Sequence, residues 1–121
     1  MEVPIGVDGE DLAELVTEEV AQGRGKVLSS GYAFIIYNAY TDEIEVVRCA
    51  STRDMAVEVG KQVYRDRYKS FIREAQERED SSWEEGAREL LEKFNETVKT
   101  EDDLLEWEDD EYERRYIVRL F

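Results

Sequence analysis

The stretch GYAFIIYNAYTDEIEVVRCA, residues 31–50, decides the fold. Residues 32–37 are apolar at successive positions, which is typical of a strand that is buried on both of its faces. Residues 38–42 carry turn-forming side chains, and residues 43–46 then alternate acidic with apolar side chains. This pattern predicts a β-hairpin whose first strand lies centrally in a sheet and whose second strand is half exposed to solvent.

Helical periodicity marks three segments on either side of the hairpin. Apolar side chains recur at helical spacing over residues 8–22, 52–78 and 82–98, which predicts an amphipathic helix in each segment. The apolar face of the first consists of Leu12, Leu15, Val16 and Val20. The expected apolar stripe of the second consists of Met55, Val59, Val63, Phe71, Ile72 and Ala75. The expected buried face of the third consists of Trp83, Leu90, Leu91 and Phe94.

Capping residues indicate where these helices begin. Ser51 or Thr52 precedes the second segment, and Ser82 begins a capping-box sequence at the third. Thr100 is expected to cap a further short helical turn. Gly60 lies inside the second helix and is expected to weaken it, since glycine costs about 1 kcal/mol relative to alanine in a helix.

The chain ends on a further strand. Residues 116–121 are rich in β-branched and aromatic side chains, which favour a strand that returns to the hairpin beside its central strand. The predicted order is therefore α-β-β-α-α-α-β. We expect residues 1–121 to form a single acidic α+β domain with a small three-stranded antiparallel sheet packed against helices.

Composition limits the classes of protein to which this chain can belong. The 121 residues carry a net charge of −15, which opposes direct binding of nucleic acid or of an anionic membrane surface. Cys49 is the only cysteine, so no internal disulfide can form, and a reducing compartment is expected. The apolar run of residues 32–37 is too short to span a membrane. These features predict a cytoplasmic protein.

The residues that usually carry catalysis are scarce. The chain has no histidine, which excludes a Ser-His-Asp or Cys-His arrangement within it. GRGK at residues 23–26 lacks the earlier glycine and the following Ser or Thr of a phosphate-binding loop. Glu89 with Glu92, and Glu106 with Asp109, have a spacing that suits Mg²⁺, but so acidic a chain contains such pairs by chance. We therefore predict no catalytic residue, no metal and no cofactor.

The positive charge is concentrated in residues 61–73, here called the basic island, which carry a net charge of +4. Lys61, Arg65 and Lys69 are spaced by four and can form one stripe on a helix, a candidate anion-binding site. Tyr64 and Tyr68 occupy the adjacent stripe, and aromatic side chains beside cations can stack on nucleic-acid bases. The alternative is that the island pairs with acids of the same chain, such as the 101–113 run.

The negative charge is densest just before the last strand, where nine of the thirteen residues 101–113 are acidic. Carboxylates held on a rigid frame can resemble a row of phosphates, and aromatic neighbours can supply the anchors of an interface. The alternative places Trp107 in the core and Tyr112 at the start of the strand. The candidate partner-binding residues are Glu106, Trp107, Glu108, Asp109, Asp110, Glu111 and Tyr112.

These observations favour a non-enzymatic protein that binds a basic surface of a nucleic-acid-handling protein or complex and inhibits or regulates it. Phage-encoded inhibitors and nucleic-acid mimics share this general character, although no motif of this chain carries a family resemblance. A small regulatory or structural module whose acidity serves only solubility or salt adaptation is the alternative. An Mg²⁺-dependent or nucleotide-binding enzyme is the third, weaker hypothesis.

Overall fold

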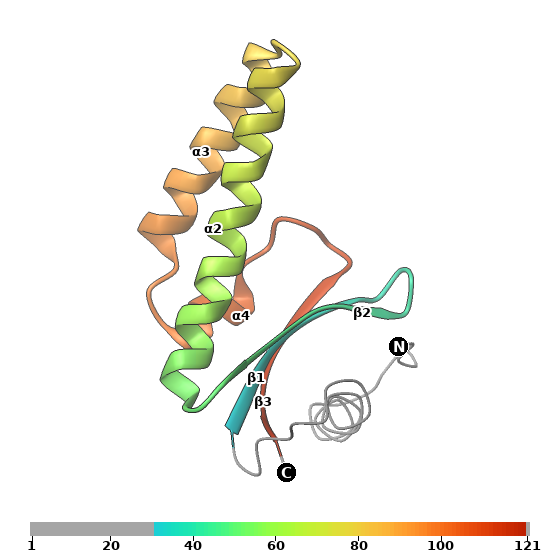
Figure 1. Ribbon diagram of the computed structural model, residues 1–121, viewed down its shortest axis with the longest axis vertical. Helices are drawn as coiled ribbons and strands as arrows, with labels where there is room; N and C mark the ends of the chain where they lie inside the picture. The colour runs from blue at the N-terminus through green and yellow to red at the C-terminus, as the bar shows by residue number, and fades with distance from the viewer. Residues whose placement is uncertain (1–30, 121) are drawn as a thin grey trace.

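The computed structural model describes residues 31–120 as a three-stranded sheet and three helices (Figure 1). The elements are β1 (Gly31–Asn38), β2 (Glu43–Ala50), α2 (Arg53–Glu77), α3 (Ser81–Thr97), α4 (Glu101–Glu106) and β3 (Glu113–Leu120). The order β-β-α-α-α-β and the α+β class agree with the prediction. The helix predicted over residues 8–22 and the loop at residues 23–26 lie outside the described residues.

The sheet is antiparallel with the order β2-β1-β3, so β1 is the central strand, as its apolar sequence predicts. Ile35 in β1 lies opposite Val47 in β2 and Tyr116 in β3. The last strand, β3, therefore returns beside β1, and the chain between β2 and β3 forms the three described helices.

A bulge interrupts the regular alternation that the sequence predicts for β2. Ile36 lies opposite Val46, but Tyr37 lies opposite Ile44, so Glu45 is the extra residue. An extra residue reverses the side to which the following side chains point. Val46 consequently packs under the helices, whereas Ile44 packs on the other face of the sheet.

Helix α2 begins where predicted, at Thr52, whose hydroxyl accepts a hydrogen bond from the backbone N–H of Met55 at 3.1 Å. Its buried face includes Ile72 and Ala75, as predicted, but differs from the predicted stripe elsewhere. Tyr64 and Tyr68 are fully buried, while Met55 is 51% exposed. The basic island therefore lies on a helix whose tyrosines belong to the core, which corrects the expectation that they could stack on bases.

Helices α2 and α3 form an antiparallel pair that extends past the sheet (Figure 1). Asp80, rather than Ser82, caps α3 by accepting a hydrogen bond from the backbone N–H of Trp83 at 3.0 Å. Because α3 packs chiefly on α2 and not on the sheet, it buries only a narrow stripe. Phe94 is fully buried, as predicted, but Leu91, expected in the same face, is only partly buried.

Gly60 marks the closest approach of α2 to the sheet. A Cβ atom there would lie 2.7 Å from Cδ1 of Phe34 and 2.8 Å from Cδ2 of Leu104, and both side chains are fully buried. The glycine that the sequence presents as a weak point of the helix is thus required by the packing.

Gly60→Ala is expected to destabilise the protein by about 1–3 kcal/mol, the usual cost of overpacking a core, despite the better helix propensity of alanine. Gly86→Ala in exposed α3 is the matched control, because a Cβ there meets no atom within 4 Å. The control is expected to gain up to about 1 kcal/mol. Urea unfolding measures both changes, and a stabilised Gly60→Ala variant would contradict the packing described.

Candidate functional site

The acidic run splits into a buried part and an exposed part. Trp107 ends α4 and is only 7% exposed. Its indole N–H donates a hydrogen bond to the hydroxyl of Tyr68 at 2.7 Å, and its ring meets the ring of Phe94 edge-on at 5.3 Å. Trp107 therefore anchors the run in the core, the alternative that the sequence left open.

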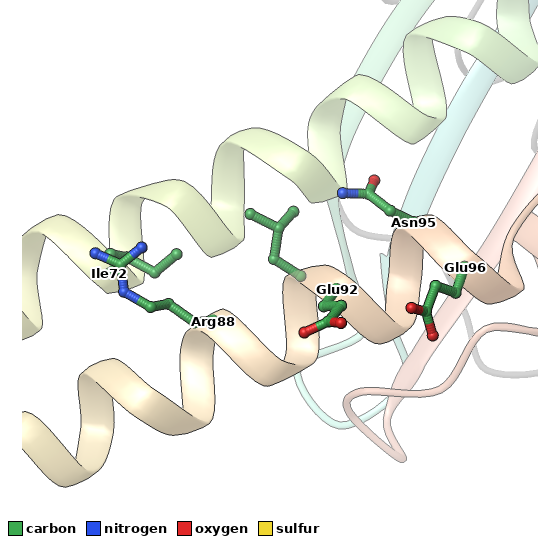
Figure 2. Close-up of a pocket in the computed structure, with 6 residues that line it drawn as sticks. Ile72, Arg88, Glu92, Asn95 and Glu96 are labelled. Atoms are coloured by element: carbon green, nitrogen blue, oxygen red, sulfur yellow. The ribbon is translucent and has the colours of Figure 1, made fainter.

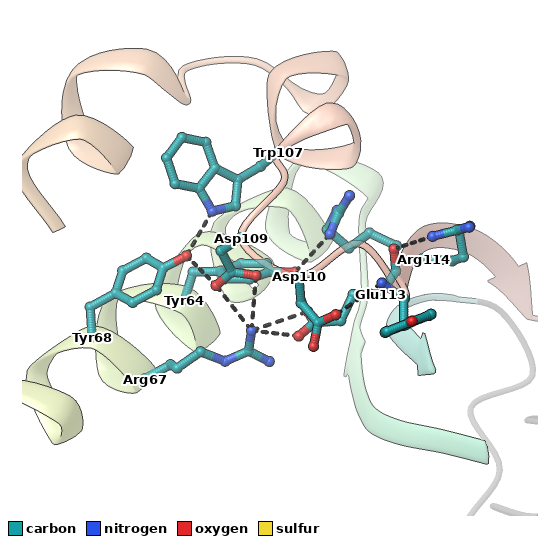
Figure 3. Close-up of polar contacts among 10 residues, drawn as sticks. Tyr64, Arg67, Tyr68, Trp107, Asp109, Asp110, Glu113 and Arg114 are labelled. Atoms are coloured by element: carbon teal, nitrogen blue, oxygen red, sulfur yellow. Dashed lines mark hydrogen bonds and ion pairs between the residues drawn. The ribbon is translucent and has the colours of Figure 1, made fainter. Parts of the chain in front are cut away.

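A cluster of charged groups fixes the rest of this anchor (Figure 3). Arg67 of α2 donates from Nη1 to Oδ2 of Asp109 at 3.2 Å and to Oε2 of Glu113 at 2.8 Å. The hydroxyl of Tyr68 donates to Asp109 at 2.6 Å, and that of Tyr64 donates to Glu113 at 3.0 Å. The two carboxylates are only 8% and 6% exposed, so one guanidinium of the basic island holds both ends of the loop before β3.

The charges within this cluster balance. Arg115, also buried, donates to the backbone carbonyl of Leu105 at 3.2 Å and to the hydroxyl of Tyr64 at 3.4 Å. The cluster as a whole thus contains two guanidiniums and two carboxylates, and Arg67 makes the ion pairs with both carboxylates. Burial opposes the charge of Arg67, but Glu113 and Asp109 outweigh it and raise the pKa of Arg67 above its usual value. Burial and the bond to Asp109 raise the pKa of Tyr68, so its phenol stays protonated and keeps donating.

We call this set of side chains the charge clamp. Its ion pairs agree with the alternative that the basic island pairs with acids of the 101–113 run, whereas the roles of Tyr64, Tyr68 and Arg115 escaped the sequence reasoning. A signal was present in the spacing of Tyr64 and Tyr68, which continue the apolar period of Ile72 and Ala75 on the same helix face. Arg67 lies next to that face, so its long side chain can reach buried acids. The members of the charge clamp are Tyr64, Arg67, Tyr68, Trp107, Asp109, Glu113 and Arg115.

The acids on either side of Asp109 lie at the surface. Glu106, Glu108, Asp110 and Glu111 are exposed, and Tyr112 is 44% exposed. Backbone groups of Tyr112 hold the loop between α4 and β3 in place. The N–H of Tyr112 donates to the side chain of Asp110 at 2.9 Å, and the carbonyl of Tyr112 accepts from the N–H of Ala39 at 2.8 Å.

That second bond ties the loop to the β1–β2 turn and creates an exposed aromatic pair. Tyr40 is 76% exposed, and its ring lies 5.2 Å from the ring of Tyr112. The turn is held by Asn38, whose side-chain oxygen accepts from the N–H groups of Tyr40 at 2.8 Å and Thr41 at 3.1 Å. We call the exposed set the acidic corner: Tyr40, Glu106, Glu108, Asp110, Glu111 and Tyr112.

The candidate anion-binding stripe of the basic island is partly occupied. Lys61 is 9% exposed and donates from Nζ to the carboxylate of Glu58 at 3.1 Å and to the carbonyl of Lys99 at 2.9 Å. Arg65 donates from Nε to the side chain of Asn95 at 3.1 Å. Lys69 is exposed. Two of the three cations thus already have partners within the chain.

A surface groove of about 330 Å³ runs between α2 and α3 (Figure 2). Ile72 and Leu91 supply apolar walls, and Arg88, Glu92 and Asn95 bring mixed polar groups to it. Its polar groups include both charge signs, so the groove does not select a ligand of one charge.

The described residues were also compared with the requirements of a metal site and of a membrane-spanning helix. Within residues 31–120 no group of three acidic or cysteine side chains is placed to hold a metal ion. Asp109, which the sequence pairs with Glu106, is engaged by Arg67. Cys49 is exposed on β2. Among the helices of residues 31–120, none combines the length and apolar character that crossing a bilayer requires.

Comparison of the chain with protein-family models, with curated proteins and with solved structures finds no match. The observations that bear on function therefore come from the acidic corner and the charge clamp.

Proposed function

We propose that this protein is a non-enzymatic acidic protein that docks on a basic surface of a nucleic-acid-handling protein or complex and inhibits or regulates it. In this role the carboxylates of the acidic corner take the place of phosphates on the partner's Lys and Arg side chains. The net charge of −15 would steer such a partner toward the protein and would repel nucleic acid itself.

One observation carries the proposal: Tyr40 and Tyr112 lie in ring contact at the surface among exposed carboxylates. Aromatic side chains are enriched among the residues that dominate binding energy at interfaces, and charged residues around them set orientation and association rate. Solubility alone requires exposed carboxylates, but it gives no reason to keep two large aromatic rings exposed beside them.

The frame under the tyrosines supports the same proposal. The charge clamp fixes Asp109 and Glu113, and the acidic corner is carried between and beside them. A loop that is ordered before binding loses less conformational entropy when the partner arrives. In this proposal Asp109 and Trp107 keep the acidic corner in position, and the exposed residues of the acidic corner contact the partner.

Replacing Tyr40 and Tyr112 together with serine is expected to abolish capture of the partner while the melting temperature changes little, because both rings are exposed. The measurement is affinity capture from a lysate of the source cells, with the captured proteins identified by mass spectrometry. We expect Lys- and Arg-rich nucleic-acid-binding proteins on the wild type, displaced by heparin.

Met55→Ser is the matched control, since Met55 is an exposed apolar side chain at the start of α2. It should capture the same proteins as the wild type. Equal capture by all three proteins, or capture that heparin leaves unchanged, would contradict docking through the acidic corner.

A further inference from the structure

Three arginines among the described residues share one arrangement, in which the guanidinium lies over an aromatic ring and also forms an ion pair with a carboxylate. In the charge clamp, Cζ of Arg67 lies 4.8 Å from the centroid of the Tyr64 ring (Figure 3). The same guanidinium donates to the carboxylate of Glu113 at 2.8 Å. The cation is thus attracted by a ring and by a carboxylate at once.

The other two examples lie nearer the surface. Cζ of Arg53 lies 5.9 Å from the centroid of the Tyr32 ring, and its Nε and Nη2 donate to both carboxylate oxygens of Glu101 at 2.6 Å. Cζ of Arg78 lies 5.8 Å from the Trp83 ring, and its Nη2 pairs with the glutamate four residues earlier at 3.0 Å. The side chains of Arg53 and Arg78 are 50% and 69% exposed, so the arrangement does not depend on burial.

The acidic corner has the rings and the carboxylates of this arrangement without the arginine. The rings of Tyr40 and Tyr112 lie 5.2 Å apart, and the carboxylate of Asp110 accepts from the N–H of Tyr112 at 2.9 Å. Among the described residues no arginine lies over either ring. Arg114, two residues after Tyr112, donates from Nη1 to two backbone carbonyls instead, at 2.7 and 3.0 Å.

We infer that the pair of Tyr40 and Tyr112 binds an arginine side chain of the partner. The partner then supplies the cation that the chain itself supplies at the three other places. This inference rests on the proposed function and adds to it the chemistry of the bound group: the basic surface presents arginine, and lysine does not replace it.

The two basic side chains differ in what they can do at such a place. A guanidinium is planar and weakly hydrated, so it can lie on a ring while its N–H groups donate to carboxylates beside the ring. An ammonium group is a compact and strongly hydrated charge, which suits oxygen atoms alone. Lys61 follows that rule, since its Nζ donates to the carboxylate of Glu58 and to the carbonyl of Lys99.

The test is isothermal titration of two twenty-residue peptides into the full-length protein at physiological salt. One peptide is arginine-rich, and the other has lysine at every arginine position, so the two have equal length and charge. We expect the wild type to bind the arginine peptide about fivefold more tightly or better, because arginine adds the ring contact and paired hydrogen bonds.

Tyr40→Leu with Tyr112→Leu removes the aromatic faces and keeps the charge of the surface. This variant should lower the preference for the arginine peptide by about two- to fivefold, the strength of an exposed cation–π contact, and bind the lysine peptide as the wild type does. Tyr40→Phe with Tyr112→Phe is the matched control, because it keeps both rings. The control should retain the preference of the wild type.

The possible outcomes separate this inference from the proposed function. Equal affinity of the wild type for the two peptides would overturn the inference and leave the proposed function in place, because a basic peptide still binds. A preference that persists unchanged in the leucine variant would also overturn it, since the rings would not be its cause. Failure of both peptides to bind would contradict the inference and the proposed function together.

Discussion

Arg67→Gln is expected to lower the free energy of unfolding by about 3–5 kcal/mol, the usual cost of removing one partner from a buried ion pair. The substitution leaves Asp109 and Glu113 without the cation that bonds to both of them, at side-chain exposures of 8% and 6%. Arg115 cannot replace it, because its guanidinium is bonded to Leu105 and Tyr64. A loss of this size removes a large part of the stability of a small domain.

Arg65→Gln is the control for that experiment. Arg65 lies on the same helix and makes a single side-chain bond, to Asn95, near the surface. Its replacement is expected to stay within about 0.5 kcal/mol, as for most surface substitutions. Urea unfolding compares the two variants, and equal midpoints would show that the charge clamp does not hold the loop.

The order of the elements can be predicted from the sequence because each element has a local cause. Alternation and turn residues specify the hairpin, and helical periodicity with Thr52 and Thr100 as caps specifies α2 and α4. The central position of β1 follows from its apolar side chains on both faces. These features depend on neighbours in the sequence, so they need no knowledge of the tertiary structure.

The buried face of α2 could not be predicted in the same way. A tyrosine is stable in a core only when its hydroxyl finds a partner. The partners of Tyr64 and Tyr68 are Glu113 and Asp109, more than forty residues further along the chain. The sequence allows the basic island to pair with the acidic run, but nothing local indicates that two of its acids bond to these tyrosines. The pattern therefore favours Met55 and other apolar residues for the stripe instead.

The same limit applies to the acidic run. The sequence identifies it as a dense block of carboxylates but does not say which of them remain available. Asp109 and Asp110 are adjacent and chemically identical, yet only Asp109 faces Arg67. Tyr40 was not among the predicted partner-binding residues, because its contact with Tyr112 joins a turn to a loop far along the chain.

The second large effect concerns Glu108→Gln, Asp110→Asn and Glu111→Gln combined. These three acids are exposed, so their neutralisation should leave the melting temperature unchanged or raise it by relieving repulsion. Binding to a basic surface should weaken by about tenfold or more, equivalent to about 1.4 kcal/mol per factor of ten. By contrast, Asp109→Asn alone should lower the melting temperature, because Asp109 forms an ion pair with Arg67 in the protein.

A second variant separates local docking from net charge. Glu85→Gln, Glu89→Gln and Glu92→Gln remove the same three charges from exposed positions of α3. Any effect of total charge is therefore equal in the two variants.

Added salt should weaken binding by the wild type steeply, because exposed charges are screened beyond about 8 Å at physiological ionic strength.

The most direct measurement is isothermal titration of a twenty-residue arginine-rich peptide into the wild type and the two triple variants at physiological salt. We predict that the wild type and the α3 variant bind the peptide with similar affinity, and that the variant of the acidic corner loses about tenfold or more. Equal losses in both variants would contradict the central claim, because the acidity would then act only through net charge.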